Sequence, residues 1–334
     1  MEDLDEAITL LTGASARADK AEISVEVAYG LRARANLLMG KWAAAASDAA
    51  KAYGTSAPYS VADVSQPTFY NATDNAWIWG IVVTTEDYLA KTGIVNWPSN
   101  LCSLTGMGYT TAASATDVAY RLINKNLWAK IPETDVRKGW WVDEDLHSPV
   151  LDNGLGEDYA YYWANGMFNG GTFPSKFSPY TNVKFGPDNG TFADTDNAQD
   201  WPLMRVEEMK LIEAEALGRD NLATGKQKLE EFVRQYRDPS YTCTAGSLDA
   251  FIDEVWFQRR VELWGEGFAL FDILRLKKPI IRQGANYPIN STFAEIAAEA
   301  PIMIYRIPEA ETSVNSAITE ADNNPAAMAP TPVN

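Results

Sequence analysis

The order of apolar and polar positions along the chain predicts two pairs of helices separated by a long irregular region. In the first pair, apolar residues recur at steps of three and four from Val27 to Leu38, which is the spacing of one helix face. Gly40 follows that face, and Gly54 closes the second helix of the pair. The alanines of this stretch allow close approach, as in tetratricopeptide-like hairpins. Residues 203–238 predict a second hairpin of similar length.

The region between the two pairs has a different texture. Residues 59–200 are rich in glycine, proline and asparagine, which predicts loops with a strand over 77–84 and a helix over 115–129. Beyond the second pair, a further helix is expected after Ser247, a suitable N-cap residue. The chain is therefore predicted to be mostly α-helical with few short strands. Long ordered loops usually carry function, so we expect ligand binding in the loop-rich segment.

Charged residues interrupt the apolar face of the helix that follows Ser247. The charged positions between residues 251 and 278 include Arg259, Arg260, Glu262, Glu266, Asp272 and Arg275. The helix over 205–217 likewise places Glu208 and Glu215 on one face with aliphatic residues. Two such helices predict buried arginine–carboxylate pairs, because guanidinium groups bind carboxylates at two points. We interpret these charges as structural, since neighbouring arginines lower the pKa of a carboxyl group and leave no general acid.

Composition and charge narrow the class of ligand. The 334 residues are 46% hydrophobic and 22% charged, as in a folded protein, and 45 acidic against 28 basic residues give a net charge of −17. Such a surface repels nucleic acids and anionic lipid headgroups, so neither is an expected partner. The chain also contains 11 Trp and 15 Tyr, more than a core of this size usually needs. Their amphipathic rings suit stacking against sugars.

Residues suited to catalysis or metal binding are scarce, and we expect no cofactor. The single histidine, His147, is interpreted as a surface loop residue. Residues 194–200 begin like a calcium loop but lack the glycine at position six and the glutamate at position twelve. An EF-hand is therefore rejected, while a looser calcium site stays open. Cys102 and Cys243 share no metal or redox spacing, and a disulfide and two buried thiols are both compatible with the sequence.

The charged motifs resemble those of the SusD/RagB family. The C-terminal signature, Arg-x-x-Glu-Leu-x-x-Glu-Gly followed by Asp and Arg, is matched by Arg259, Glu262, Leu263, Glu266, Gly267, Asp272 and Arg275. The earlier helix is similar to a second family motif through Arg205, Glu208, Leu211, Ala214, Glu215 and Ala216. "IPETDVRK" and "YRIPEAETSVNSAITEADNNP" resemble two further family elements. Gln258 stands where the family usually has Glu, and Ala269 where it often has Arg, so one ion pair is expected to be missing.

The resemblance implies a single SusD-like domain over residues 1–334, in which tetratricopeptide-like hairpins pack against a loop-rich segment. Its expected parts are a hairpin, a loop-rich ligand-binding segment, a helical core with the signature motifs, and C-terminal loops with a tail, at 1–58, 59–200, 201–280 and 281–334. Family members begin with a lipoprotein signal, an acylated cysteine and a longer run of such helices. We therefore expect this chain to be N-terminally truncated and to lack the lipid anchor.

The resemblance also implies a function. SusD-like proteins are surface lipoproteins of the outer membrane that bind oligosaccharides or polysaccharides without catalysis. They deliver these glycans to a SusC-like TonB-dependent transporter. We accordingly expect a glycan ligand, a SusC-like partner, a location at the cell outer membrane, and membrane attachment only through an N-terminal lipid anchor. One alternative is a protein-interaction scaffold built on the tetratricopeptide-like repeats, and a less favoured one is a glycan-cleaving enzyme.

Aromatic and amide side chains in the loop-rich segment are the candidate ligand-binding residues. They are Trp97, Asn100, Tyr109, Trp140, Trp141, Tyr162 and Trp163. The first three lie in stretches whose prolines and glycines rigidify and expose the chain. The others follow one another in sequence and cannot all face one way, so we expect about half of them to be buried. Trp77 and Trp79 alternate on the predicted strand, which indicates a shared core-facing side, and are not candidates.

Overall fold

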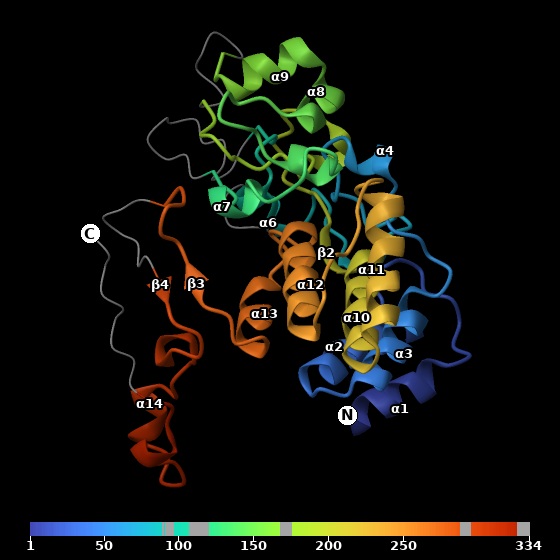
Figure 1. Cartoon of the computed structure of the whole chain (residues 1–334), viewed down its shortest axis with the longest axis vertical. Helices are drawn as coiled ribbons and strands as arrows, with labels where there is room; N and C mark the ends of the chain where they lie inside the picture. Colours follow the sequence, from blue (N-terminus) through green and yellow to red (C-terminus); the bar gives the residue numbers. More distant parts are fainter. Residues whose placement is uncertain (89, 91–96, 107–119, 168–175, 288–294, 326–334) are drawn as a thin grey trace. The chain divides into compact units, whose positions relative to one another are not determined.

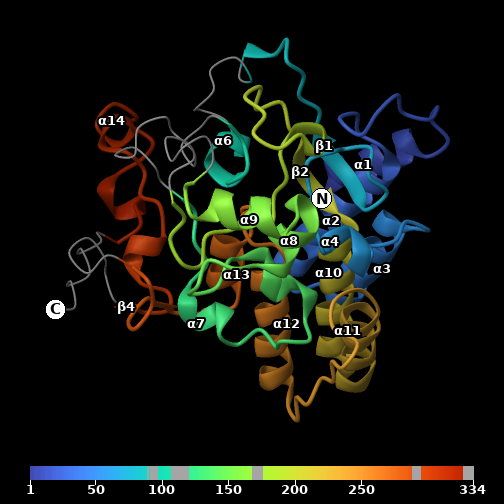
Figure 2. The ribbon, with the colours of Figure 1, turned by 90° about the horizontal axis from the view of Figure 1, so that it is seen from above.

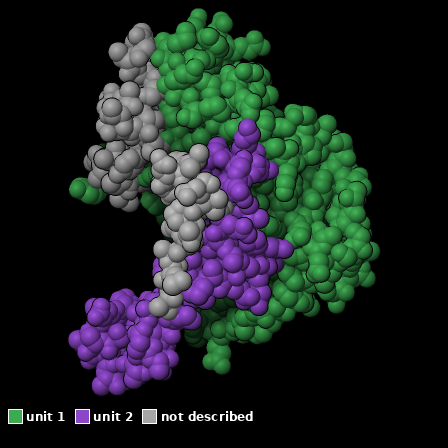
Figure 3. Space-filling view, turned by 60° about the vertical axis from the view of Figure 1, so that its left-hand side comes forward, with its two compact units in different colours: residues 1–123, 127–266 green, residues 124–126, 267–334 purple. Residues whose placement is uncertain are grey.

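The structure, a computed structural model, divides into two compact units. It describes residues 1–88, 90, 97–106, 120–167, 176–287 and 295–325. Unit 1 contains residues 1–123 and 127–266, and unit 2 contains residues 124–126 and 267–334, as coloured in Figure 3. The sequence predicts one domain and did not indicate this division, which falls inside the C-terminal signature. Asp272 and Arg275 consequently belong to unit 2, and the other signature residues to unit 1.

Both predicted helical hairpins are present in unit 1. Helices α2 (Val25–Leu38) and α3 (Trp42–Tyr53) form the first, and α10 (Val206–Asp220) and α11 (Leu222–Tyr236) form the second. The glycines that follow α2 and α3 adopt positive φ, so the predicted helix ends are confirmed. Helix α10 contacts both helices of the first hairpin as well as α11, and these helices lie together in Figures 1 and 2.

Glycines allow α10, α11 and α12 (Leu248–Glu262) to approach one another closely. A Cβ atom on Gly225 of α11 would lie 2.3 Å from the Cα atom of Gly218 of α10. A Cβ atom on Gly218 would lie 2.0 Å from the Cε1 atom of Phe251 in α12. We call Gly218, Gly225 and Phe251 the glycine crossing. The predicted start of α12 is confirmed, because the Ser247 hydroxyl accepts a hydrogen bond from the Ala250 N–H at 3.2 Å.

A short sheet leads into α10 and corrects one prediction. Strand β1 (Trp77–Ile81) pairs antiparallel with β2 (Trp201–Arg205) and ends earlier than the predicted strand. The register shifts on both sides of Trp79, which is the mark of a β-bulge. Trp77 is therefore buried among the aromatic residues of the loop-rich segment, whereas Trp79 packs against the first hairpin. The predicted shared side of Trp77 and Trp79 is wrong because the bulge breaks the alternation.

The loop-rich segment contains only short helices within the described residues. They are α4 (Val61–Val64), α6 (Trp97–Leu101), α7 (Lys125–Trp128), η1 (Val136–Trp140), α8 (Pro149–Leu155), α9 (Glu157–Ala164) and η3 (Asp188–Gly190). The helix predicted over 115–129 is wrong over 120–124, while residues 115–119 lie outside the described residues. The cause is a β-bridge between Leu122 and Thr181, after which the Ile123 N–H donates to the Tyr180 carbonyl at 3.1 Å.

The remaining elements lie at the two ends of the chain. Unit 1 begins with α1 (Glu2–Leu11), and the elements of unit 2 are α13 (Ala269–Arg275), the antiparallel pair β3 (Ile280–Ile281) and β4 (Glu295–Ile296), η5 (Pro301–Met303), α14 (Glu309–Thr312) and η6 (Glu320–Asp322). The predicted class, mostly helical with few short strands, is confirmed for the described residues. None of the described helices combines the length and the apolar character that a membrane span requires.

Candidate functional site

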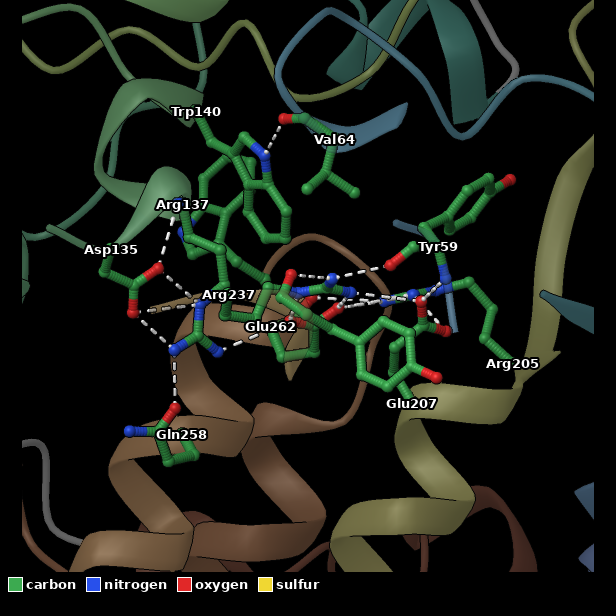
Figure 4. Close-up of polar contacts among 12 residues, drawn as sticks. Tyr59, Val64, Asp135, Arg137, Trp140, Arg205, Glu207, Arg237, Gln258 and Glu262 are labelled. Atoms are coloured by element: carbon green, nitrogen blue, oxygen red, sulfur yellow. Dashed lines mark hydrogen bonds and ion pairs between the residues drawn. The ribbon is translucent and has the colours of Figure 1, made fainter. Parts of the chain in front are cut away.

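A buried charged cluster lies around the C-terminal end of α12 in unit 1 (Figure 4). Its members are Asp135, Arg137, Lys184, Arg205, Glu207, Arg237, Gln258, Glu262 and Glu266, all buried or nearly so. Glu262 receives the Arg237 guanidinium at two points, with Nε–Oε2 at 2.8 Å and Nη2–Oε1 at 2.9 Å. Two more arginines approach the same carboxylate, Arg137 at 3.3 Å and Arg205 at 3.4 Å. Glu262 is therefore the centre of the cluster.

Glu266, one turn further along the chain, is held in the same way. Arg205 donates to it at two points, from Nε to Oε2 and from Nη2 to Oε1, each at 2.8 Å. The Lys184 ammonium donates to Oε1 at 2.7 Å. The carboxylates of Glu262 and Glu266 thus face cationic partners inside the protein and do not line an open cleft. This confirms the structural interpretation of the charged helix.

Arg137 uses the neutral Gln258 where the family pattern has a carboxylate. Its Nη2 atom donates to the Gln258 side-chain oxygen at 2.6 Å, and its Nε atom donates to Asp135 at 2.9 Å. The amide group of Gln258 donates in turn to Glu254 at 2.9 Å. The sequence predicts that one ion pair of the family pattern is missing here. A hydrogen bond from Arg137 to Gln258 takes its place, so Arg137 keeps its position.

The carboxyl groups of the cluster differ in their pKa. Burial favours the neutral form of Glu262, but the charges of Arg237, Arg205 and Arg137 outweigh it and hold the pKa well below the usual value. The pKa of Glu266 is also lowered, since Arg205 and Lys184 outweigh its burial. Glu207 differs: burial raises its pKa, although it pairs with Arg205 at 2.8 Å and Arg237 at 3.1 Å.

Lys184 is a fully buried lysine inside an aromatic cage. Its Nζ atom lies 4.8 Å from the ring centroid of Phe69, 5.0 Å from that of Trp140 and 4.9 Å from that of Phe185. It donates at 2.9 Å to the backbone carbonyls of Glu262 and Trp264. Burial lowers the pKa of Lys184 to about 8 despite the nearby Glu266. This side chain fixes the turn that follows α12.

The other predicted structural residues pair locally or with a different helix. Glu208 binds Arg34 of α2, with Nε–Oε1 at 2.7 Å and Nη2–Oε2 at 2.6 Å, so the predicted pairing of its carboxylate with α12 is wrong. Glu215 pairs with Arg219 one turn further along α10, at 2.9 Å. In unit 2, Asp272 pairs with Arg275 at 2.8 Å. Arg259 of α12 is buried, as predicted.

Sequence reasoning did not find Lys184, Glu207 and Arg237 as members of the cluster. Glu207 stands directly before Glu208 in the motif matched from Arg205 to Ala216, so its acidity was visible in the sequence but the direction of its side chain was not. Arg237 follows the second hairpin and Lys184 lies in a loop, and neither has a periodic pattern around it. Their partners are remote in sequence, which local spacing does not reveal.

Three of the candidate ligand-binding residues are buried, which corrects the prediction for them. Trp140, Trp141 and Trp163 are at most 1% exposed. The indole N–H of Trp140 donates to the Val64 carbonyl and that of Trp163 to the Ser103 carbonyl, each at 3.0 Å. Rings packed on all sides have no free face for a sugar. Three of the four adjacent candidates belong to the core, which is more than the half that we expected.

The remaining candidates differ in exposure. Trp97 is half-buried in α6, where its ring meets the edge of Phe185 at 4.6 Å between centroids. Asn100 is half-buried too, and its side-chain oxygen accepts from Arg121 at 2.9 Å. Tyr162 is 45% exposed on α9. Tyr109 lies outside the described residues. Trp97, Asn100, Tyr109 and Tyr162 therefore stay predicted ligand-binding residues.

The residues considered for catalysis and metal binding occupy ordinary positions. His147 lies in a surface loop, as interpreted, and its Nε2 atom is 2.6 Å from the Asp152 carboxylate. Cys102 and Cys243 are both free thiols and buried, which decides between the two alternatives. In the part of the chain that the structure describes, no three His, Cys, Asp or Glu side chains gather as a metal site would require. The looser calcium site in 194–200 stays a prediction.

Comparison with known proteins adds a family match and a fold match. The family model described as "SusD family" matches residues 133–325. A SusD-like carbohydrate-binding protein from Bacteroides vulgatus has a similar structure, with a TM-score of 0.69 and 22% identity over 97% of this chain and 65% of that one. A SusD superfamily protein from Bacteroides thetaiotaomicron gives 0.67 and 20%, again over 97% and 65%.

A second SusD superfamily protein from Bacteroides vulgatus gives a TM-score of 0.66 and 22% identity, over 98% of this chain and 64% of that one. At such identities the likeness shows a shared fold. The chain spans about 65% of the length of the similar solved structures. No curated protein matches the sequence.

Proposed function

The chain belongs to the SusD family, and from that premise we propose that it binds oligosaccharides or polysaccharides without cleaving them. We further propose that it does so at the cell outer membrane, as a surface-exposed lipoprotein. There it delivers the glycan to a SusC-like TonB-dependent transporter. Its similarity in fold to a SusD-like carbohydrate-binding protein supports the choice of ligand class.

The observation that carries this proposal is the burial of the signature charges. Glu262 and Glu266 are paired with arginines and lysine, and their pKa values are lowered, so neither supplies a proton to a glycosidic oxygen. The charged motif therefore acts as a framework. Aromatic side chains outside the core remain for binding, and Tyr162 and its neighbour Tyr161, 58% exposed, offer ring faces on α9.

Calorimetric titration of the full chain with a panel of oligosaccharides tests the proposal. We expect heat of binding with at least one glycan, and no new reducing ends after incubation with the corresponding polysaccharide. A protein-interaction scaffold would give no heat with any sugar. A glycan-cleaving enzyme would release reducing ends. Either result would replace the proposed function.

A further inference from the structure

A hollow with an unusual lysine lies in unit 1, and none of the described candidate ligand-binding residues lines it. It has a volume of about 410 Å³ and is bounded by residues 54–58 and by helices α10 and α11. Residues 54–58 follow α3, and the helices α3, α10 and α11 lie together in Figures 1 and 2. Its polar and aromatic lining includes Tyr53, Thr55, Ser56, Lys210, Glu213, Lys228, Glu231, Phe232, Gln235 and Tyr236. The volume is within the range of small-molecule sites.

Lys210 is a positive charge in this hollow that contacts an aromatic ring and, within the described residues, no carboxylate. Its side chain is half-buried, and its Nζ atom lies 3.4 Å from the ring centroid of Tyr53. Within the described residues it makes neither a hydrogen bond nor an ion pair. Burial lowers the pKa of Lys210, the negative charge of Glu213 opposes this effect, and the like charge of Lys228 adds to it. An anion in contact with the ammonium would offset both effects.

The acidic side chains of the hollow are already engaged. Glu213 accepts from the Tyr53 hydroxyl at 2.8 Å and lies 3.9 Å from the Lys228 ammonium. Glu231 lies 3.4 Å from the same ammonium and accepts from Gln227 at 2.9 Å. Lys228 therefore lies between two carboxylates, and neither of them is within ion-pair distance of Lys210, although both attract its charge.

The rest of the lining suits a sugar. The hydroxyls of Thr55 and Ser56 and the amide of Gln235 make no side-chain hydrogen bonds within the described residues, so they are available to sugar hydroxyls. The Tyr236 ring, 6.3 Å from Phe232 between centroids, is half-buried and offers an apolar face for sugar C–H groups.

We propose that this hollow binds a uronic-acid residue at the end of an acidic glycan, with the sugar carboxylate on the Lys210 ammonium. The inference rests on the proposed glycan-binding function and narrows its ligand class. The net charge of −17 opposes long polyanions, so the hollow selects a single terminal carboxylate. An acidic peptide is less well matched, because the hydroxyl and amide groups here lie on helices and a turn and form no strand edge for an extended backbone.

Galacturonate and galactose are the probes, because they differ only at the carbon that carries the carboxylate. We expect galacturonate to bind the full chain in a calorimetric titration at low ionic strength, and galactose to bind at least about tenfold more weakly. The variant Lys210→Met should lose about 10- to 100-fold in galacturonate affinity, the range of one charge-assisted hydrogen bond. Added salt should weaken galacturonate binding and leave galactose binding unchanged.

The matched control is Lys51→Met. Lys51 also lies over a tyrosine ring, 5.1 Å from the centroid of Tyr29, but it is exposed and does not line the hollow. This variant should bind galacturonate as the unchanged protein does. Thermal unfolding of both variants checks that each is folded.

Several results would overturn the proposal. Galacturonate that gives no heat, or binds Lys210→Met as tightly as the unchanged protein, removes the site. Acetate or an acidic peptide that binds as tightly as galacturonate removes the sugar as the ligand. Titration with neutral oligosaccharides separates this outcome from the proposed function: if they bind and Lys210→Met does not alter their affinity, glycan binding stands while the uronic-acid site fails.

Discussion

The buried charged cluster and the glycine crossing hold together the same helices by opposite means. At the cluster, Glu262 on α12 gathers guanidinium groups from other segments through directed bonds of 2.8 to 3.4 Å. At the crossing, Gly218 and Gly225 have no side chains, and the backbones of α10 and α11 meet directly. Ion pairs determine the packing of the cluster, whereas the lack of side chains at two glycines determines the packing of the crossing. Neither exposes a group to a ligand.

The difference teaches where the framework is sensitive. Removing a partner from the cluster leaves buried charges that water does not reach, and adding an atom at the crossing forces two helices apart. A side chain outside both regions can change without disturbing either. Stability and binding should therefore respond to different sets of substitutions.

The largest effect is expected from Glu262→Ala. The change removes the carboxylate that Arg237, Arg137 and Arg205 share, so these three buried guanidinium groups lose a counter-charge. We expect a loss of about 3–5 kcal/mol in the free energy of unfolding, measured by urea denaturation. Glu231→Ala, at an exposed position, is the control and should change stability by less than about 0.5 kcal/mol. A loss below about 1 kcal/mol at Glu262 would show that the cluster is not a framework.

The next effect concerns the crossing. In Gly225→Ala the new methyl group would lie 2.3 Å from the Cα atom of Gly218, which is backbone and does not rotate away. We expect a loss of about 1–3 kcal/mol from overpacking, despite the higher helix propensity of alanine. At Gly246 an added Cβ meets nothing within 4 Å, so Gly246→Ala should leave the urea midpoint nearly unchanged. Equal behaviour of the two variants would contradict the close approach.

A smaller effect is expected from pH through Lys184. An unfolded lysine loses its proton near pH 10.5, whereas burial lowers the pKa of Lys184 to about 8. Between these values the unfolded state binds more protons, so Lys184 makes stability rise with pH from about 8 to 10.5 and fall as pH drops through 8. We expect a rise on the order of 1 kcal/mol, which Lys184→Met should abolish. A variant that keeps the same pH profile would remove Lys184 as its source.

The smallest effect on stability is expected outside both regions. Tyr162→Ala should weaken binding of a glycan ligand about two- to tenfold, the value of one stacked ring, while the melting temperature stays the same. Tyr88→Ala, which removes another exposed ring, is the control and should change neither quantity. A lower melting temperature for Tyr162→Ala would place that ring in the framework.

Trp97→Ala sharpens the contrast further. Because the Trp97 ring contacts Phe185 and its indole N–H donates to the Gly265 carbonyl at 3.3 Å, the change should lower both glycan affinity and the melting temperature. We expect the stability loss to be about 1–3 kcal/mol, since the ring is only half-buried. A loss of affinity with full stability would mean that the ring serves binding alone.

The sequence was sufficient wherever the structure depends on local spacing. The hairpins followed from apolar steps of three and four and from Gly40, and the buried character of Glu262 followed from charges on an apolar face. It was insufficient where distant segments decide. The bulge at Trp79 and the bridge from Leu122 to Thr181 depend on strands remote in sequence.

The same limit applies to the candidate site. Adjacent aromatic residues predicted that some rings are buried, but only the packed structure distinguishes Trp163, fully buried, from Tyr162 beside it. Lys184 and Arg237 joined the cluster from a loop and from the end of α11, without a pattern of their own. Which carboxylate each of these cationic residues pairs with is therefore decided by the tertiary structure and not by the local sequence.

The charged cluster ends where unit 1 ends, and this has an evolutionary consequence. Glu266 is the last residue of unit 1, and its described partners, Arg205 and Lys184, precede it in the chain. Gly267 follows with a φ of +88° and open space around its Cβ position. Mutation can therefore lengthen, shorten or diversify the sequence beyond Gly267 without altering the hydrogen bonds and ion pairs that hold Glu262 and Glu266 within the described residues, which leaves descendants of this protein free to vary about the last fifth of the chain.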